Sequence, residues 1–404
     1  MTMESGASAG HKHNQEHPAS SGDAWLLDGF EAGDFFFASP TTQYRGWSKD
    51  GVLSAYQPAD SAIVQSLFDQ AAQRGISEPM LFGLVPFDMT KQASMAIPVH
   101  WDSAGIPSKA TGATPANKAR PRVVKREPVP APEQYGDMVR AALGLFAQGE
   151  LKKVVLSRAM DVLLDRPLDY AQLLPDLLSR NAKGYTFAVP IWGDGADAPP
   201  TGVMVGASPE LLVRRTGDRI VVNPLAGSIG RNSDPEKDQA LKEGLACSEK
   251  DLREHGYVVA DIERILRSYC DELDMPDGPS VIGTDTLWHL STYITGRLRN
   301  PAITALELSC ALHPTPAICG HPTAAAFNHI RTLEPFDRGY FAGLVGWQHA
   351  NGDGEWALAL RCALHTGDSQ LRLYAGAGTV AGSDPDSEIR ETATKMETFM
   401  RAIS

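Results

Sequence analysis

Residues 355–380, EWALALRCALHTGDSQLRLYAGAGTV, consist of two apolar segments separated by the turn-forming sequence HTGDSQ at 365–370. Strand-like segments joined by a short turn that contains Gly-Asp are typical of an antiparallel hairpin. Residues 202–228, GVMVGASPELLVRRTGDRIVVNPLAGS, have the same character, and further strands are expected at 152–164 and 185–192. The sequence therefore predicts a largely antiparallel sheet.

Helices are expected between groups of strands and not in steady alternation with them. The segments with helical patterns lie at 132–149 and at about 168–182, 249–269, 302–312 and 322–332. Runs of hairpins broken by helices favour an α+β fold, with helices packed outside an antiparallel core.

Two segments have the composition of irregular chain. Residues 1–22 are rich in Ser, Gly, His and Glu, and we expect them to be a disordered tail. Residues 103–134 are rich in Pro, Ala, Lys and Arg, and we expect an exposed connection or long loop there.

The overall composition excludes several classes of protein. With 43% hydrophobic and 21% charged residues in a chain of 404, it is that of a globular protein. A net charge of -12 argues against nucleic-acid binding, although a local basic site can still bind a small anion. The five cysteines form no CxxC pair, no apolar run is long enough to cross a membrane, and no secretory signal is visible. We therefore expect a cytoplasmic protein that does not bind membranes.

Glu254 has an unusual place on the helix expected at 249–269. Helical periodicity puts it on the side of Val258, Ile262 and Ile265. A carboxylate there needs a partner, a proton or a metal if it is buried. Alternatively, this end of the helix rises out of the core, and Lys250, one turn earlier, pairs with the carboxylate in water.

Three further charged residues lie beside apolar strands. Lys153 directly precedes one, either as an edge lysine or as a base held in an apolar cleft. Glu210 follows a strand where the chain turns. Arg361 interrupts the apolar run at 355–364, where alternation puts it on the face of Ala357 and Ala359. It is either a solvated arginine or one with room beside it for a ligand carboxylate.

The C-terminal segment places charge on one side of a helix. Glu388, Glu391 and Lys395 are spaced three and four apart, which fits an ordinary solvated face as well as a functional one. The preceding glycines, in YAGAGTVAG at 374–382, are expected to form a loop between strand and helix. Their spacing does not match a dinucleotide fingerprint, and they let the backbone pass close to a neighbour or a ligand.

The motifs together resemble the chorismate-utilising enzymes, specifically isochorismate synthases. The matching segments follow the family order over about 150–400: KVVLSR, GASPELL, NPLAGSIGR, SEKDLREH, LWHLST, LHPTPAICG, LEPFDRGYFAGLVGW, LALRCA, LYAGAGTV and SEIRETATKMETF. DFFFASP at 34–40 is similar to siderophore-type members. The resemblance implies a single chorismate-binding domain over 23–404, the family's antiparallel β-sandwich core, and a monomer.

The resemblance also implies a magnesium-dependent reaction on chorismate, with the site residues carried over position by position. Lys153 matches the base that activates water, and Glu210 the acid that protonates the departing C4 hydroxyl. Glu254 and Glu391 match magnesium ligands, and Glu388 lies nearby.

Substrate-binding positions are implied in the same way. Arg361 and the backbone at Gly376 match the groups that bind the enolpyruvyl side of the substrate. The other matching contacts are Gly227, Ser228, His289, Ala317 and Lys395.

The identity of individual residues favours addition of water over the related reactions. Lys153 stands where anthranilate synthases have glutamine, and Ala226 stands where aminodeoxychorismate synthases carry a lysine nucleophile. Salicylate synthases, the alternative, tend to have tyrosine at the position of Phe341. A catalytically silent binding protein is disfavoured because each catalytic position holds a competent residue.

Overall fold

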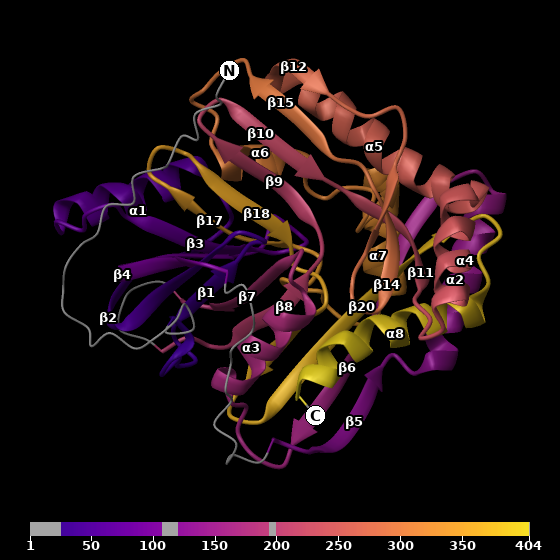
Figure 1. Cartoon of the computed structure of the whole chain (residues 1–404), viewed down its shortest axis with the longest axis horizontal. Coiled ribbons are helices and arrows are strands. Elements are labelled where there is room, and N and C mark those ends of the chain that lie inside the picture. The colour runs from indigo at the N-terminus through magenta and orange to yellow at the C-terminus, as the bar shows by residue number, and fades with distance from the viewer. Residues whose placement is uncertain (1–25, 107–119, 194–198, 404) are drawn as a thin grey trace.

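Antiparallel pairing organises almost the whole chain. The computed structural model describes residues 26–106, 120–193 and 199–403, so the expected tail at 1–22 lies outside the described residues. The described strands form one seventeen-stranded sheet and one three-stranded sheet (Figure 1). The strands of the large sheet are β1 (Phe35–Ala38), β2 (Thr42–Gln57), β3 (Met80–Val85), β4 (Ala93–Gly105), β5 (Val123–Val129), β6 (Lys153–Leu164), β7 (Tyr185–Pro190), β8 (Val203–Ser208), β9 (Leu211–Thr216), β10 (Arg219–Asn223), β12 (Cys270–Asp274), β15 (Ile294–Leu298), β16 (Gly320–His321), β17 (Leu344–His349), β18 (Gly354–Leu358), β19 (Cys362–Thr366) and β20 (Gln370–Val380).

The pairings connect these strands into one continuous ribbon. Its order is β5, β6, β20, β19, β8, β7, β1, β2, β4, β3, β17, β18, β9, β10, β15 and β12, and each of these pairs is antiparallel. β16 adds to the start of β6. The small sheet consists of β11 (Leu225–Gly230), β14 (Leu287–Ser291) and β13 (Ser280–Gly283). The predicted antiparallel α+β fold is confirmed.

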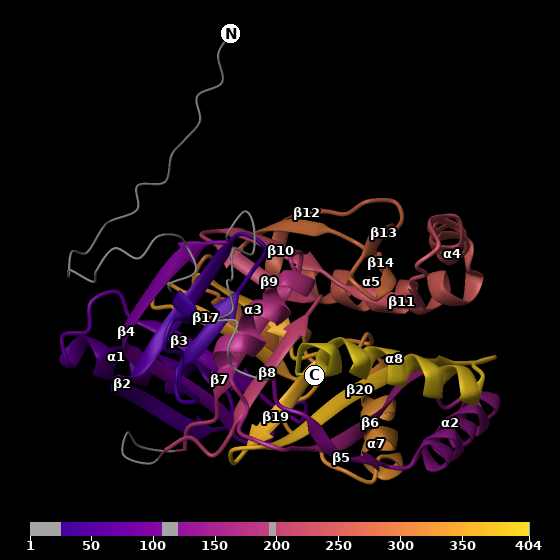
Figure 2. The same ribbon diagram turned by 60° about the horizontal axis from the view of Figure 1, so that its bottom comes forward.

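Eight helices accompany the described strands and pack against the sheets from outside. They are α1 (Ser61–Gln73), α2 (Pro132–Ala147), α3 (Tyr170–Arg180), α4 (Pro235–Cys247), α5 (Glu249–Tyr269), α6 (Ala305–Leu312), α7 (Thr323–Leu333) and α8 (Pro385–Ile403). Figure 2 separates a layer of α4, α5 and β11–β14 from a layer of β5, β6, β20 and α8. The candidate site described below is built from both layers. None of the described helices is both long and apolar enough to span a membrane.

Helix α5 forms where the sequence predicts it, from a local start signal and an apolar stripe. Ser248 caps it by accepting a hydrogen bond from the backbone N–H of Asp251. The buried stripe continues through Val258, Ile262 and Leu266. A capped amphipathic helix of this kind holds its first turn at a fixed height above the core, which decides where Glu254 lies.

Two sequence-based expectations about irregular chain are wrong. Residues 123–129, expected within an exposed connection, are mostly exposed but form β5, which pairs with β6. Of the glycines expected in a loop before the last helix, Gly376 and Gly378 lie inside β20, which runs to Val380 along β6, and Gly382 lies in the turn after it. In both cases the pairing partner is distant in sequence, so local composition gives no sign of it.

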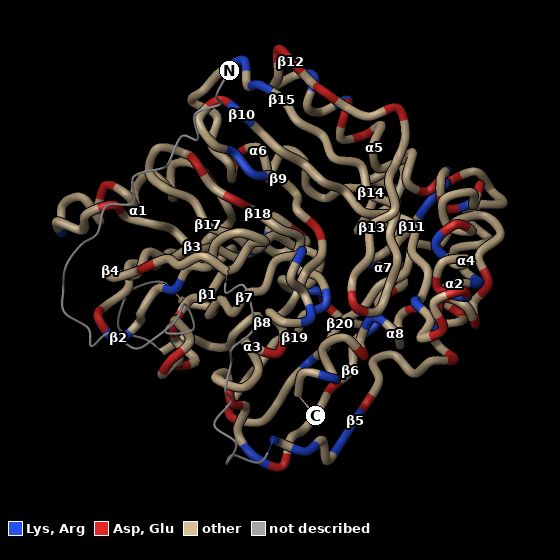
Figure 3. Tube along the Cα trace, in the orientation of Figure 1, with Lys and Arg blue, Asp and Glu red and all other residues tan. Residues whose placement is uncertain are grey.

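Charge is spread over the described surface. Figure 3 shows Lys and Arg interspersed with Asp and Glu along the described chain, on helices and strand ends alike. The charged residues considered below are therefore defined by their burial and their partners, and not by a gathering of one sign of charge.

Candidate active site

One cavity brings together nearly all of the residues singled out from the sequence. Its volume is about 270 Å³, near the small end of the range for ligand pockets, roughly 300–1,000 Å³. It is bounded by the face of β6 and β20, by α5, α8, β11 and β14, and by the four loops β8–β9, α6–β16, α7–β17 and β18–β19. The predicted residues that line it are Glu210, Gly227, Ser228, Glu254, His289, Ala317, Phe341, Arg361, Gly376, Glu388, Glu391 and Lys395.

Lys153 lies behind this wall and not on it. It opens β6 with no exposed surface, and its Nζ is 3.0 Å from Oε1 of Glu254. The contact is an ion pair, without a well-aligned hydrogen bond to any described atom. Lys153 is thus a buried lysine that faces the cavity through Glu254, and it is not an exposed edge lysine.

Glu254 is buried, as its position on the apolar stripe allowed. It is 8% exposed on the first turns of α5, above Val258. The alternative of a wet carboxylate paired with Lys250 is not observed, because Lys250 contacts a different glutamate. Gly378 explains how the carboxylate fits against β20: a Cβ at that position would overlap Oε1 of Glu254.

Helix α8 turns its charged face inward. Glu388 is only 2% exposed, and its Oε1 is 3.6 Å from Nζ of Lys250 on α5. Burial, followed by repulsion from Glu391, raises the pKa of Glu388 to about 7. Lys395 bonds both Oε1 of Glu391, at 2.7 Å, and the carbonyl oxygen of Gly376, at 2.9 Å. Each of the three carboxylates on this side of the cavity therefore faces a lysine.

Glu210 lies at the turn between β8 and β9, as predicted, and is 4% exposed. Its Oε1 accepts a hydrogen bond of 3.1 Å from the backbone N–H of Leu225. Burial raises the pKa of Glu210 to about 7, against the smaller opposing effects of that N–H and of Lys153, Lys395 and Arg361. A large fraction of this carboxyl group is therefore protonated near neutral pH, which lets it act as a proton donor.

Arg361 lies between two strands, which corrects the sequence-based assignment. β18 ends at Leu358 and β19 begins at Cys362, and Arg361 has a φ of +47°. An uninterrupted strand was assumed from alternation, but this left-handed residue breaks it and directs the guanidinium into the cavity. Such a conformation costs of the order of 1 kcal/mol in a residue with a Cβ and is found preferentially at functional sites.

The guanidinium of Arg361 is oriented by a neutral histidine. Its NH2 group lies against Nε2 of His289, and its NH1 group donates to Oγ1 of Thr284 at 3.3 Å. Burial, then the charges of Arg361 and Lys395, hold the pKa of His289 well below its usual value. Since Arg361 can only donate, Nε2 accepts, and Nδ1 carries the hydrogen shared with Ser228 at 3.0 Å.

The remaining predicted positions complete the wall. Ala317 belongs to the loop between α6 and β16, and Gly227 lies in β11. Phe341 stacks on Tyr374, with ring centroids 5.0 Å apart and an interplanar angle of 7°. This aromatic pair closes one end of the cavity with apolar surface.

The carboxylates of Glu254, Glu388 and Glu391 are of the chemical type that binds magnesium, although their side chains do not converge on one point in the structure. No three His, Cys, Asp or Glu side chains in the described part of the chain converge as metal ligands. However, Glu254, Glu388 and Glu391 line one cavity, and the raised pKa of Glu388 reflects burial and a neighbouring like charge. Carboxylate oxygens are the ligands that Mg²⁺ prefers, and a cation there would relieve that repulsion.

Several residues of the site were not predicted as part of it. Lys250, considered in the sequence only as a solvent-exposed partner of Glu254, lines the cavity. Ser157 and Arg338 line it as well, and Arg338 forms a buried ion pair with Glu334. The available signal for the last pair was an acid and an arginine four residues apart within the segment EPFDR. Ser157 gave none, because a serine in a strand is common.

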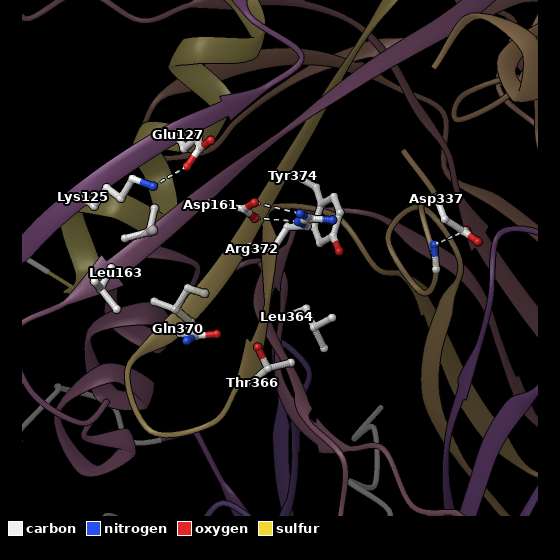
Figure 4. A pocket seen from close by; sticks show the side chains of 13 residues that line it. Lys125, Glu127, Asp161, Leu163, Asp337, Leu364, Thr366, Gln370, Arg372 and Tyr374 are labelled. Atoms are coloured by element: carbon white, nitrogen blue, oxygen red, sulfur yellow. Dashed lines mark hydrogen bonds and ion pairs between the residues drawn. The ribbon is translucent and has the colours of Figure 1, made fainter. Parts of the chain in front are cut away.

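A second hollow lies beyond Tyr374, which borders both, and does not offer comparable chemistry. Figure 4 shows its lining from β5, β6, β19 and β20. Its main cations are already paired: Nζ of Lys125 is 2.6 Å from Glu127, and Arg372 makes a two-pronged contact with Asp161. This hollow therefore carries no candidate site.

Comparison with known proteins identifies relatives over nearly the whole chain. A family model described as chorismate binding enzyme matches residues 89–404. The isochorismate synthase DhbC of Bacillus subtilis (strain 168) is 42% identical over 388 residues, covering 94% of this chain and 95% of the relative. The vibriobactin-specific isochorismate synthase of Vibrio cholerae is 41% identical over 373 residues, covering 91% of each chain.

A solved structure agrees with these relatives. The crystal structure described as that of a 2,3-dihydroxybenzoate-specific isochorismate synthase, DhbC, from Bacillus anthracis has a TM-score of 0.85 and 39% sequence identity. It covers 94% of this chain and 98% of its own.

Proposed function

The chain belongs to the chorismate binding enzymes, and we propose that it is an isochorismate synthase, an isomerase that converts chorismate to isochorismate. The reaction adds water at C2 of the ring and releases the C4 hydroxyl as water. The observation that carries the proposal is that one cavity has a buried glutamic acid, Glu210, whose pKa is about 7, and a buried lysine, Lys153, directly behind its wall at Glu254. Relatives about 40% identical over most of both chains support the same activity.

Lys153 and Glu210 divide the proton transfers. Lys153, as base, takes a proton from the water that attacks C2, and Glu210, as acid, gives a proton to the leaving hydroxyl at C4. The two groups come from different strands, and Lys153 is close enough to act on the charge of Glu210. Hydroxide is a poor leaving group, so a carboxyl group that still holds its proton near neutral pH meets the main chemical requirement.

Arg361 would bind the enolpyruvyl side of the dianionic substrate, together with the backbone of Gly376, and Lys395 would make a further contact with the substrate. His289 keeps Arg361 in place without competing for the anion, because its lowered pKa leaves it uncharged. Gly227, Ser228 and Ala317 would contact the rest of the substrate. Glycines in two of these positions allow the backbone itself to serve as the contact surface.

Glu254 and Glu391 are proposed to hold Mg²⁺, with Glu388 beside them. When bound, the metal supplies positive charge that fixes and polarises the ring carboxylate. In the described arrangement these carboxylates pair with Lys153, Lys395 and Lys250. The chain therefore supplies both the oxygen ligands and cations that keep the same region balanced in charge.

The apolar end of the cavity favours stopping at isochorismate. Phe341 has no hydroxyl with which to hold the pyruvyl carboxylate for elimination, and it is stacked flat on Tyr374. Ala226, buried near the cavity, offers no amine nucleophile. These side chains support isochorismate synthase over the salicylate-forming and aminating members.

Several broader features are proposed with this activity. The similarity to a vibriobactin-specific relative supports a role in siderophore biosynthesis. We also propose a cytoplasmic enzyme that acts as a monomer, with residues 23–404 as one chorismate-binding domain.

The activity is tested by incubating purified protein with chorismate and Mg²⁺ and separating the products by chromatography. Isochorismate as the main product supports the proposal, and its formation should stop when a chelator removes the metal. Salicylate with pyruvate would replace it by the alternative activity. No turnover with Mg²⁺ present would refute both.

A further inference from the structure

The strand that carries Lys153 has a gap in its pairing beside the cavity. One edge of β6 pairs with β20 continuously over residues 153–163. On its other edge, β6 pairs with β16 at residues 153–154, and its pairing with β5 begins at Ala159. Among the described strands, none pairs with 155–158 on that edge. Unpaired backbone groups at a buried position are costly, so something else must satisfy them.

The loop before β16 fills part of this gap, because the N–H of Val155 donates to the carbonyl oxygen of Cys319 at 2.8 Å, and two side chains fill the part beside it. The NH2 group of Arg338 donates to the carbonyl oxygen of Val155 at 2.7 Å, and the backbone N–H of Ser157 donates to Oε1 of Glu334 at 2.8 Å. A donor and an acceptor are thus presented to β6 in the places where a neighbouring strand would present them.

The same two side chains are locked to each other and to the opposite wall. Nε and NH2 of Arg338 bond the two carboxylate oxygens of Glu334 at 2.8 and 2.5 Å, and the side chains are 3% and 1% exposed. The NH1 group of Arg338 donates to the carbonyl oxygen of Ile318 at 2.9 Å, next to Ala317. The guanidinium also lies over the ring of Phe87, 4.3 Å from its centroid.

From these contacts we infer that Glu334 and Arg338 form a positioning pair that replaces a missing strand and fixes the spacing of two cavity walls. One wall is β6, with Lys153 two residues before the clamped Val155. The other is the loop that contains Ala317. Arg338 borders the cavity, but the donors of its guanidinium are directed at protein acceptors, so it acts through the backbone and not on the substrate.

Stability alone is a weak explanation for such a pair. Desolvating two charges offsets most of their attraction, and buried ion pairs can often be replaced by apolar residues without loss of stability. Glu334 and Arg338 hydrogen-bond three backbone groups at the edge of the cavity, those of Val155, Ser157 and Ile318. They therefore fix the positions of Lys153 and of the loop that contains Ala317, which apolar side chains could not do.

The inference rests on the proposed function, and Glu334→Gln tests it. The amide can still accept from Ser157, but its NH2 group would face Nε of Arg338. Displacement of the catalytic base by about 1 Å can cost about 100-fold. We expect kcat to fall by roughly 10- to 100-fold while KM changes less than about threefold, because Arg361 and Lys395 lie on other elements.

Asp34→Asn provides the matched control. Asp34 pairs with Arg45 at 2.6 Å, with side chains 3% and 2% exposed, and neither residue lines the cavity. Both variants lose a buried ion pair, so both should lower the melting temperature. Only Glu334→Gln should lower kcat. If the two variants are equally destabilised and both keep the parent kcat, the pair is merely structural and the inference is overturned.

A charge-swapped variant, Glu334→Arg with Arg338→Glu, separates an ion pair from a strand mimic. It keeps opposite charges in contact but presents a donor to Ser157 N–H and an acceptor to the Val155 carbonyl. Our inference predicts no recovery of kcat, whereas recovery to the parent value would refute it. If the swapped chain does not fold, Arg338→Lys replaces it. That variant keeps the charge but has too few donors in the right plane for Val155 and Ile318, so we expect the same loss of kcat.

Hydrogen exchange provides a readout that needs no turnover. In Glu334→Gln, the amide of Ser157 should exchange faster than in the parent, and in Asp34→Asn it should not. Unchanged exchange at Ser157 in Glu334→Gln would count against the clamp. A parent protein that does not convert chorismate would refute the proposed function, and the exchange measurement would still decide whether the clamp exists.

Discussion

Replacing Glu210 by Gln should remove most of the turnover and, at the same time, stabilise the protein above neutral pH. Burial raises the pKa of Glu210 from 4.5 to about 7, so the folded chain holds this proton more tightly than the unfolded chain does. Its contribution to stability is therefore complete below about pH 4.5 and declines as the pH rises through about 7. At about pH 8 the cost is roughly 3 kcal/mol in the free energy of unfolding. Gln carries no charge to desolvate and keeps an oxygen for Leu225 N–H.

The assay compares Glu210→Gln, Glu355→Gln and the parent by urea unfolding at about pH 5 and about pH 8. Glu355 is a matched control because burial also raises its pKa to about 7, and it is 3% exposed on β18, away from the cavity. Relative to the parent, both variants should gain roughly 2.5 kcal/mol between the two pH values, because the unfolded carboxyl group is already partly ionised at about pH 5. Only Glu210→Gln should lose turnover, by at least about 100-fold.

The two measurements refute different parts of the reasoning. Turnover by Glu210→Gln within a few-fold of the parent would remove Glu210 from its role as the acid. A stability difference that does not change with pH would show that burial does not hold the proton on this carboxyl group. Equal loss of turnover in Glu355→Gln would mean that any buried carboxylate matters for folding of the site, and the assignment to Glu210 would fail.

Lys153→Ala should abolish turnover and leave the far-ultraviolet circular dichroism unchanged. The control Lys152→Ala, at the exposed neighbouring residue, should remain active. Activity in Lys153→Ala would exclude Lys153 as the base. Gly378→Ala should weaken the response to Mg²⁺, because a Cβ there overlaps Oε1 of Glu254, and an unchanged titration by calorimetry would count against the metal assignment. Phe341→Tyr should increase the share of salicylate and pyruvate among the products, and a product ratio identical to that of the parent would show that this position does not separate the two activities.

Local patterns in the sequence predicted the elements well where the signal is itself local. Helix α5 has the bounds expected from its cap and its apolar stripe, and the hairpin of β19 and β20 turns within the expected HTGDSQ segment. The burial of Glu254 also followed from helical spacing. Each of these depends on neighbours within a few residues of one another.

The partners of the charged residues could not be predicted, because they are set by tertiary contacts. Helical spacing left open a pair of Lys250 with Glu254, but Lys250 pairs with Glu388 on another helix, and Glu254 pairs with Lys153 on a strand. Several ways of matching lysines to glutamates satisfy the sequence equally well. Only the packing of α5 and α8 over β6 selects one.

Arg361 shows a different limit. Alternation within an apolar run predicts the facing of a side chain only while the strand continues. β18 ends at Leu358 and β19 begins only at Cys362, and Arg361, with its positive φ, is the last of the three residues between them. No glycine marks this break in the sequence. Arg361 lines the cavity because of the break and not because of alternation, since Ala357 and Ala359, on the face predicted for it, do not line the cavity.

The pairing of β6 with β20 also has a consequence for how the chain is made. Lys153 is opposite Val380, 227 residues later, and β3 likewise has β17 as its neighbour on one edge. At roughly 5–20 residues per second, a ribosome needs about 10–45 s to deliver the partner of β6. During that interval the apolar strand VVLS has an unpaired edge that could associate with other chains. The last helix follows directly, so synthesis completes the sheet and the catalytic cavity within the same few seconds.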